Sequence, residues 1–337
     1  MPKSSRTKAS PHNPAREFGE IIWHKTTFEK RRNTGCISSF SNGNIGTKDP
    51  SKTADAIARC CPKFYIEKDF AVAALYVVRQ GETKMRFYLD IPVQLPGNIQ
   101  KTYDLIVPEG VAGGIPLLVW IHGGGWCGGE KRIYNDFERF SHRGYAVLSI
   151  DYRFSQDAPF PAQLIDCKTA IRWARANAVK YGYNAEKILV GGSSAGGHLA
   201  ALLGVTNGQE KYDRGPYLEY SSDVQAVVDE FGPSDLTVEK LPALKKDLQA
   251  LLQNDAEKIH HASPSRLVCG GEPPFLILHG TADSCVPIEQ SRELANILKQ
   301  AGNAVQFIEI PSGGHGFDTR EFYDTLAQFV LSQLPKL

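Results

Sequence analysis

Apolar runs alternate with amphipathic stretches from about Phe64 to the end of the chain. Six of the runs are continuous in Val, Ile and Leu: "IPLLVWIHG", "YAVLSIDY", "KILVGGSS", "VQAVVDEFG", "PPFLILHGTAD" and "AVQFIEIPSGGHG". Strands that are buried on both faces of a parallel sheet require this pattern, because neither face meets water. Two earlier runs, "MRFYLDIPV" and "TYDLIVP", are separated by Pro and Gly and predict antiparallel strands.

The stretches between these runs predict helices that cover the sheet. In "PFPAQLIDCKTAIRWARANA" apolar residues recur with the helical period, and "QSRELANILKQAG" stops at Gly302, a typical signal for a helix C-terminus. A last helix is expected around Phe322, Leu326, Phe329 and Val330. This alternation predicts an α/β fold with a mostly parallel central β-sheet of about eight strands, flanked by helices on both faces.

The predicted domain spans residues 64–337, and one segment within it departs from the strand and helix rhythm. Residues 236–264 are mostly helix-forming and lie between two predicted strands. We interpret them as a small helical insertion near the functional site, because insertions of this kind commonly shape the rim of a pocket. Residues 1–63 form a basic N-terminal extension, expected either to be poorly ordered or to contribute to a cap.

Composition limits the class of protein. The chain has 337 residues, of which 42% are hydrophobic and 22% charged, with a net charge of +1. The basic residues before position 64 are not interleaved with aromatic ones, so we expect no nucleic-acid partner. No apolar run approaches the roughly 20 residues of a spanning helix, and the first twenty residues hold no apolar signal core. The sequence therefore predicts no membrane span and a cytoplasmic protein.

The seven cysteines are odd in number and scattered along the chain. This distribution fits reduced thiols better than a disulfide framework. Neither the cysteines nor the nine histidines have the spacing that closes a tetrahedral metal shell. We therefore expect no metal and no cofactor.

The strongest chemical signal is the stretch "KILVGGSSAGGHLAALL". A predicted strand ends in Gly-x-Ser-x-Gly and a helix-forming run follows at once, which is the sequence context of a nucleophile elbow. Only Ser194 has glycine both two positions before and two positions after, at Gly192 and Gly196, so it is preferred over Ser193. Small neighbours are needed because the serine sits in a strained turn. Ser194 is the predicted nucleophile.

A serine nucleophile needs a base, and the base needs an acid that orients it. In a parallel sheet both partners should come from later strands that end at the same edge as Ser194. The run "FLILHGTADSCVP" offers Asp283, and "VQFIEIPSGGHGF" offers His315. Asp229 and Asp235, which flank the preceding strand, remain alternatives to Asp283.

The run "HGGGW" places three glycines, which have no side chains to shield their backbone N–H groups, directly after an apolar strand. Acyl transfer by a serine passes through an oxyanion that preorganised N–H donors stabilise. Gly123, Gly124 and Gly125, together with the amide of Ala195 after the nucleophile, are the predicted oxyanion hole. A phosphate cradle is the alternative, but the Lys-Ser/Thr of a P-loop does not follow.

Three aromatic side chains are candidates for the substrate pocket, namely Trp126, Phe154 and Phe160. They occur in loops near the predicted mouth of the site. Packing of these loops is an equally good interpretation of the same residues.

These motifs, in this order, resemble the α/β-hydrolase superfamily. They are "HGGGW", "DYRFS", "PFPAQLIDCKTAIRW", "GGSSAGGHLA", "FGPSDL", "LHGTADSCVPIEQS" and "GGHGF". More narrowly, the chain resembles carboxylesterases related to hormone-sensitive lipase and the bacterial acetyl or feruloyl esterases. The resemblance covers about Thr102 to Leu334 and implies that Ser194, Asp283 and His315 form a catalytic triad.

The expected function is therefore that of a serine carboxylesterase acting on a small-molecule ester. The substrates would be short acyl or aryl esters, including acetyl or feruloyl groups on carbohydrate. An arylformamidase or peptidase-like amide hydrolase is one alternative. A non-catalytic receptor of the same fold is another, although the receptors known to us have lost the histidine that His315 would supply. A monomer or a homodimer is expected.

Overall fold

The computed structural model describes residues 84–110, 114–131 and 140–316, the strands at 64–67 and 74–77, and positions 325, 328, 329 and 332. The chain divides into two units, residues 1–49 and 50–337. The predicted extension over 1–63 lies outside the described residues, and so do Phe322, Leu326 and Val330 of the expected last helix. Phe329 of that helix is described, and it is helical and buried.

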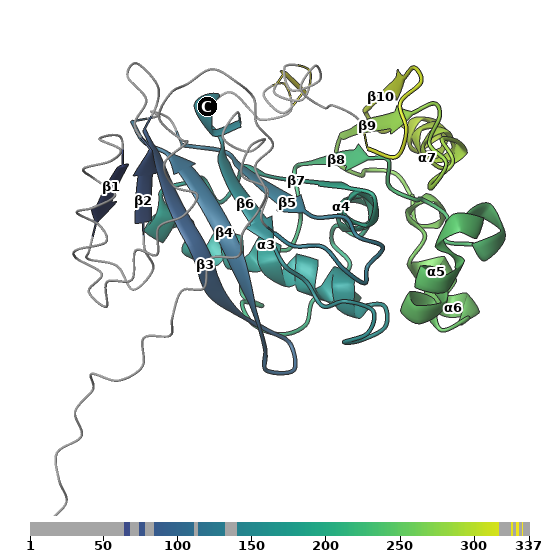
Figure 1. Ribbon diagram of the computed structural model, residues 1–337, viewed down its shortest axis with the longest axis horizontal. Coiled ribbons are helices and arrows are strands. Elements are labelled where there is room, and N and C mark those ends of the chain that lie inside the picture. The colour runs from purple at the N-terminus through teal and green to yellow at the C-terminus, as the bar shows by residue number, and fades with distance from the viewer. Residues whose placement is uncertain are drawn as a thin grey trace, which may run out of the picture. The chain divides into compact units, whose positions relative to one another are not determined.

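Ten strands form one sheet in the described part of the chain (Figure 1). In chain order they are β1 (Phe64–Glu67), β2 (Ala74–Val77), β3 (Met85–Leu95), β4 (Ile99–Pro108), β5 (Leu117–Ile121), β6 (Ala146–Ile150), β7 (Ile188–Ser193), β8 (Ala226–Glu230), β9 (Phe275–Gly280) and β10 (Val305–Ile310). Their order in the sheet is β1-β2-β3-β4-β6-β5-β7-β8-β9-β10. Pairing is antiparallel from β1 through β4 to β6, and parallel from β6 to β10.

The predicted fold class is confirmed. Strands β3 to β10 make the expected mostly parallel sheet, and β1 and β2 add two antiparallel strands beside β3. The strands β5, β6, β8 and β9 are buried along their whole length, and β7 is buried except at its last residue, Ser193, as their continuous apolar runs require. Their registers bring the carboxyl ends together, because Ile121 pairs with Gly192 and Ser193 pairs with Glu230.

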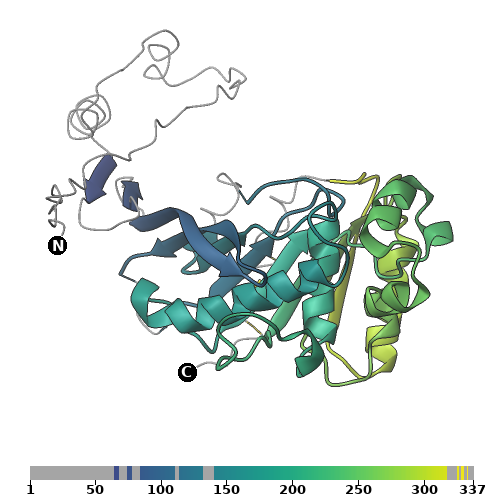
Figure 2. The same cartoon turned by 90° about the horizontal axis from the view of Figure 1, so that it is seen from below.

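Helices cover the sheet between the strands. They are α3 (Ala162–Tyr181), α4 (Ala195–Val205), α5 (Lys245–Leu252), α6 (Ala256–His261) and α7 (Glu289–Gln300). Short 3₁₀ helices lie at η1 (Glu210–Tyr212), η2 (Val238–Lys240), η3 (Pro242–Leu244) and η4 (Pro264–Arg266). Figure 2 shows α3 running along one face of the sheet.

Alternate residues of the strands β3 to β10 enter two separate apolar clusters, one on each face of the sheet. In β5, Leu117, Val119 and Ile121 join the cluster that contains α3, α4 and α7, whereas Leu118 and Trp120 join the opposite one. The second cluster also contains Phe140 and Phe329. The period of two residues is that of a strand buried on both faces. None of the described helices is long and apolar enough to cross a membrane.

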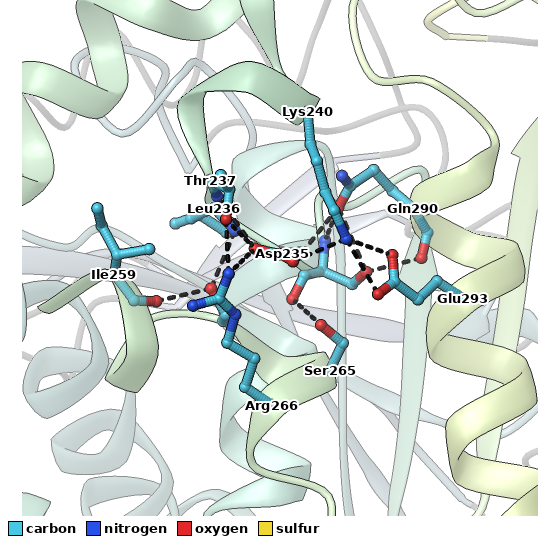
Figure 3. A network of polar contacts seen from close by, with 11 residues as sticks. Asp235, Leu236, Thr237, Lys240, Ile259, Ser265, Arg266, Gln290 and Glu293 are labelled. Atoms are coloured by element: carbon cyan, nitrogen blue, oxygen red, sulfur yellow. Dashed lines mark hydrogen bonds and ion pairs between the residues drawn. The ribbon is translucent and has the colours of Figure 1, made fainter. Parts of the chain in front are cut away.

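The helical insertion predicted at 236–264 is present as η2, η3, α5 and α6. Asp235 forms hydrogen bonds and ion pairs with residues near both ends of the insertion (Figure 3). The side chain of Asp235 is buried. Its carboxylate accepts hydrogen bonds from Thr237 (2.7 Å) and Arg266 (2.9 Å), and it lies 2.8 Å from Lys240 Nζ. The backbone N–H of Asp235 donates to Gln290 of α7 at 2.8 Å. The insertion is thereby anchored to helix α7.

Replacing Asp235 with asparagine is expected to lower the free energy of unfolding at pH 7 by about 2 kcal/mol, because hydrogen bonds to a buried charge are lost. Burial alone would raise the pKa of Asp235, but Lys240, Thr237 and Arg266 hold it below its usual value. The stabilisation is therefore complete above the unfolded-state pKa of about 4 and is lost as the pH falls below it. Urea unfolding of both proteins should show a difference that shrinks in this window.

The control is Glu293→Gln, which removes the exposed partner of the same Lys240. Its expected cost is at most about 1 kcal/mol, because exposed ion pairs contribute little. A difference between Asp235→Asn and the unsubstituted protein that does not change from pH 7 to pH 3 would contradict the assignment.

Candidate active site

Ser194 occupies a strained turn between β7 and α4. Its φ is 55°, in the left-handed region that a serine rarely adopts. The turn is held by two backbone hydrogen bonds, from Ser194 N–H to Glu230 O (2.8 Å) and from His198 N–H to Ser194 O (3.0 Å). A Cβ atom at Gly196 would overlap the carbonyl oxygen of Ile121, and one at Gly192 would lie 2.5 Å from the backbone of Gly196. Both glycines are therefore required by the close approach of the chain.

The structure brings Ser194, His315 and Asp283 together. His315 follows β10, and its Nε2 lies 2.9 Å from Ser194 Oγ. Its Nδ1 lies 2.7 Å from Oδ2 of Asp283, which follows β9. A carboxylate can only accept, so Nδ1 carries the proton and Nε2 is left to accept the hydroxyl proton of Ser194. The ring of Phe231 packs against His315 with centroids 4.9 Å apart.

Asp283 is held as a carboxylate although its side chain is fully buried. Burial favours the neutral acid, but hydrogen bonds from His279, His315 and the backbone outweigh it and hold the pKa of Asp283 well below its usual range. The backbone donors are Cys285 N–H (2.8 Å) and Val286 N–H (2.9 Å), both to Oδ1. The negative charge that orients His315 is therefore present at all ordinary pH values.

His279 is a second histidine on Asp283 whose role the sequence did not indicate. It is buried in β9, and its Nε2 lies 3.2 Å from Asp283 Oδ2 and 2.9 Å from Val286 O. Because both of these neighbours accept, Nε2 carries the proton, and Nδ1 accepts from the Ser291 hydroxyl at 2.7 Å.

The two alternative acids lie elsewhere. Asp235 belongs to the anchor of the insertion described above. Asp229 in β8 is buried, and its Oδ1 accepts the N–H of Gly232 at 2.9 Å. Burial raises the pKa of Asp229 to about 7. The acid next to Nδ1 of His315 is therefore Asp283, not Asp229 or Asp235.

The glycine loop lies directly against the elbow. A Cβ atom at Gly123 would be 3.3 Å from Ser194 Cβ and 2.9 Å from Ser193 O. Gly124 has a φ of 116° and accepts backbone hydrogen bonds from Cys127 and Gly128, which fold the loop into a turn. Ala195 is the first residue of α4, so its N–H has no acceptor within the helix.

Gly125 faces another part of the molecule. A Cβ atom there would be 3.2 Å from Asp247 Oδ2, on helix α5 of the insertion. Of the three predicted loop glycines, Gly123 is therefore next to the nucleophile and Gly125 is next to the insertion.

Two of the three aromatic candidates are buried. Trp126 is 0% exposed, and its indole N–H donates to His198 Nδ1 at 3.0 Å. Phe160 is 2% exposed, and its backbone N–H donates to Leu251 O at 3.0 Å. Phe154 is half-buried and packs its ring against Tyr152. Trp126 and Phe160 therefore pack the loops in this structure, and their contact with a substrate stays a prediction.

His198 explains why Trp126 is turned inward. The imidazole is fully buried, which lowers its pKa to about 4 and keeps it neutral. With Nδ1 accepting from Trp126, Nε2 donates to Ala262 O at 2.7 Å, at the end of the insertion.

Within the described residues no group of three or more His, Cys, Asp or Glu side chains could hold a metal ion.

The chain is similar in sequence to known esterases. The BD-FAE family model matches residues 103–298. Esterase LipC of Mycobacterium tuberculosis is 36% identical over 214 residues, which cover 60% of this chain and 53% of that protein. Esterase LipQ of the same organism is 33% identical over 241 residues, covering 68% and 57%. The chain spans about half the length of these curated relatives.

Solved structures of esterases are similar in fold. A truncated carbohydrate esterase from gut microbiota is 31% identical, with a TM-score of 0.64 over 69% of this chain and 90% of that one. An acetyl ester-xyloside bifunctional hydrolase from Caldicellulosiruptor lactoaceticus is 26% identical, with a TM-score of 0.62 over 72% and 92%.

Proposed function

Because the chain belongs to the BD-FAE family and has the α/β-hydrolase fold, we propose that it is a serine carboxylesterase. The observation that carries this proposal is the hydrogen-bonded series from Asp283 through His315 to Ser194 Oγ, with contacts of 2.7 and 2.9 Å. A serine that is strained, paired with an imidazole and placed beside a glycine loop has the features of an activated nucleophile.

In the proposed reaction, Ser194 Oγ attacks the carbonyl carbon of the ester while His315 Nε2 takes the hydroxyl proton. The tetrahedral oxyanion accepts hydrogen bonds from the backbone N–H groups of Ala195 and the glycine loop, and Asp283 stabilises the imidazolium. Collapse breaks the ester C–O bond, and His315 gives its proton to the leaving alcohol. Water then attacks the acyl-enzyme with the same histidine as base, which releases the acid and restores Ser194.

The proposed substrates are short acyl or aryl esters, including acetyl or feruloyl groups on carbohydrate. The similarity to the carbohydrate esterase and to the acetyl ester-xyloside hydrolase supports this range. The presence of His315 beside Ser194 favours an enzyme over a receptor of the same fold.

The test is hydrolysis of p-nitrophenyl esters of increasing chain length, run beside acetylated xylan, methyl ferulate and N-formylkynurenine. We expect the highest kcat/KM with short esters, and covalent labelling by a fluorophosphonate. Preferential cleavage of N-formylkynurenine would instead indicate an amide hydrolase. Absence of both turnover and labelling would overturn the serine esterase mechanism and leave the receptor alternative.

A further inference from the structure

A carboxylate on the inserted helix α5 lies over the outer end of the glycine loop. Asp247 Oδ1 is 3.7 Å from Cys127 Sγ, and its Oδ2 would be 3.2 Å from a Cβ atom at Gly125. The side chain is half-buried. Helix α5 is fixed in this position four residues later, where Leu251 O accepts the N–H of Phe160. Asp247 is therefore held over the loop and does not merely lie on a free surface.

The glycine loop lies between Asp247 and the predicted nucleophile Ser194. Gly123 is in contact distance of Ser194, and the Cα atoms of Gly123 and Gly125 are at most about 7.6 Å apart, because consecutive Cα atoms are 3.8 Å apart. The charge of Asp247 also reaches the opposite side of the site. Burial and the charges of Asp283 and Asp247 raise the pKa of the Cys285 thiol, two residues beyond the orienting acid.

The polar groups around Asp247 at this rim can exchange hydrogen bonds with hydroxyl groups. Gln156 Nε2 donates to the carbonyl oxygen of Cys127 at 3.0 Å, and both residues are exposed. The Cys127 thiol stays protonated, because burial and the nearby Asp247 raise its pKa. Asp247 thus lies beside two neutral polar groups, the Cys127 thiol and the Gln156 amide, at the outer end of the glycine loop.

We propose that Asp247 is a specificity-determining residue that selects the alcohol portion of the ester by charge. It favours neutral alcohols with further hydroxyl groups, because its carboxylate can accept hydrogen bonds from those hydroxyls. It repels alcohols that carry a carboxylate. This inference rests on the proposed esterase function. It goes beyond that function by assigning a residue and a class of substrate to the outer end of the glycine loop.

The experiment compares two acetates that differ in the charge of the alcohol, methyl 4-acetoxybenzoate and 4-acetoxybenzoate. In Asp247→Asn, the ratio of kcat/KM for the anionic ester to that for the neutral ester is expected to rise about tenfold, because a repulsive charge in a partly buried site is removed. Asp247→Lys should raise the ratio further. In the unsubstituted protein, added NaCl should raise the same ratio, because salt screens the repulsion.

The matched control is Glu257→Gln, which removes a carboxylate from α6 of the same insertion. Its side chain is 84% exposed, and its ion-pair contact is to His261. The charge ratio is expected to stay unchanged in this variant. Thermal melts of each variant report whether the insertion remains folded.

The outcomes separate the two proposals. If the unsubstituted protein hydrolyses the neutral ester and Asp247→Asn changes both esters equally, Asp247 has only a structural role and the inference is wrong. If the unsubstituted protein hydrolyses neither ester, the proposed function fails and the inference falls with it.

Discussion

Replacing Ser194 with alanine is expected to lower kcat for p-nitrophenyl acetate by about 10⁴- to 10⁶-fold, because the acyl-enzyme can no longer form. The KM should change far less, since the methyl group keeps the shape of the site apart from one oxygen. The same variant should not be labelled by a fluorophosphonate. Initial-rate kinetics and intact-protein mass spectrometry measure the two effects.

The neighbouring serine supplies the control for this prediction. Ser193 is the last residue of β7 and differs from Ser194 by one position. The hydrogen bond to His315 Nε2 and the strained turn both belong to Ser194. Ser193→Ala should therefore keep kcat within about tenfold and should still be labelled. Equal losses in the two variants would mean that the turn, and not the hydroxyl of Ser194, is what matters.

Replacing Asp283 with asparagine is expected to lower kcat by about 10⁴-fold while leaving the protein folded. An asparagine can donate its amide N–H to His315 Nδ1, which would move the ring proton to Nε2 and leave no acceptor for the Ser194 hydroxyl. His279 also favours a full negative charge at this position, because its Nε2 donates toward the same Oδ2. The loss should appear in kcat at every pH where the enzyme is stable.

Asp229→Asn is the matched substitution for this test. Asp229 is a buried acid on the neighbouring strand, and its hydrogen bond from Gly232 N–H can be kept by the asparagine oxygen. We expect kcat to remain within about tenfold. A large loss in Asp229→Asn with a small loss in Asp283→Asn would reassign the orienting acid to β8.

The fold could be predicted largely because burial on both faces leaves a strong pattern. The runs that become β5 to β9 are apolar at consecutive positions, and a parallel sheet is the arrangement that requires this. Once the sheet is parallel, its carboxyl ends meet at one edge. For this reason, residues as distant in sequence as Ser194 and His315 were expected to lie close together, and they are within hydrogen-bond distance.

Contacts between loops leave no such pattern in the sequence. The partners of loop side chains could therefore not be predicted. Trp126 was a candidate for the pocket because tryptophan near a mouth often contacts substrate, but its indole N–H is used by His198. Nothing in the local sequence shows where that partner will be. The same holds for Gly125, which meets Asp247 only because the insertion folds back over the loop.

The contact between His279 and Asp283 could not be predicted for a different reason. It precedes Asp283 by four residues, a separation that brings side chains together on a helix but has no fixed meaning at the end of a strand. A histidine followed by glycine in a turn is read most simply as a structural hydrogen bond. The structure shows that its Nε2 faces the carboxylate that orients His315.

The absence of a side chain at Gly196 lets the elbow pack directly against the end of β5, from which the glycine loop begins. The nucleophile and the amides around it therefore have their relative positions before any substrate arrives, and different substrates meet the same geometry. The insertion is joined to the rest of the domain by separate hydrogen bonds, at Asp235, at Leu251 and at Ala262. Substitutions on the outer face of α5 are therefore expected to leave the arrangement of Ser194, His315 and Asp283 unchanged.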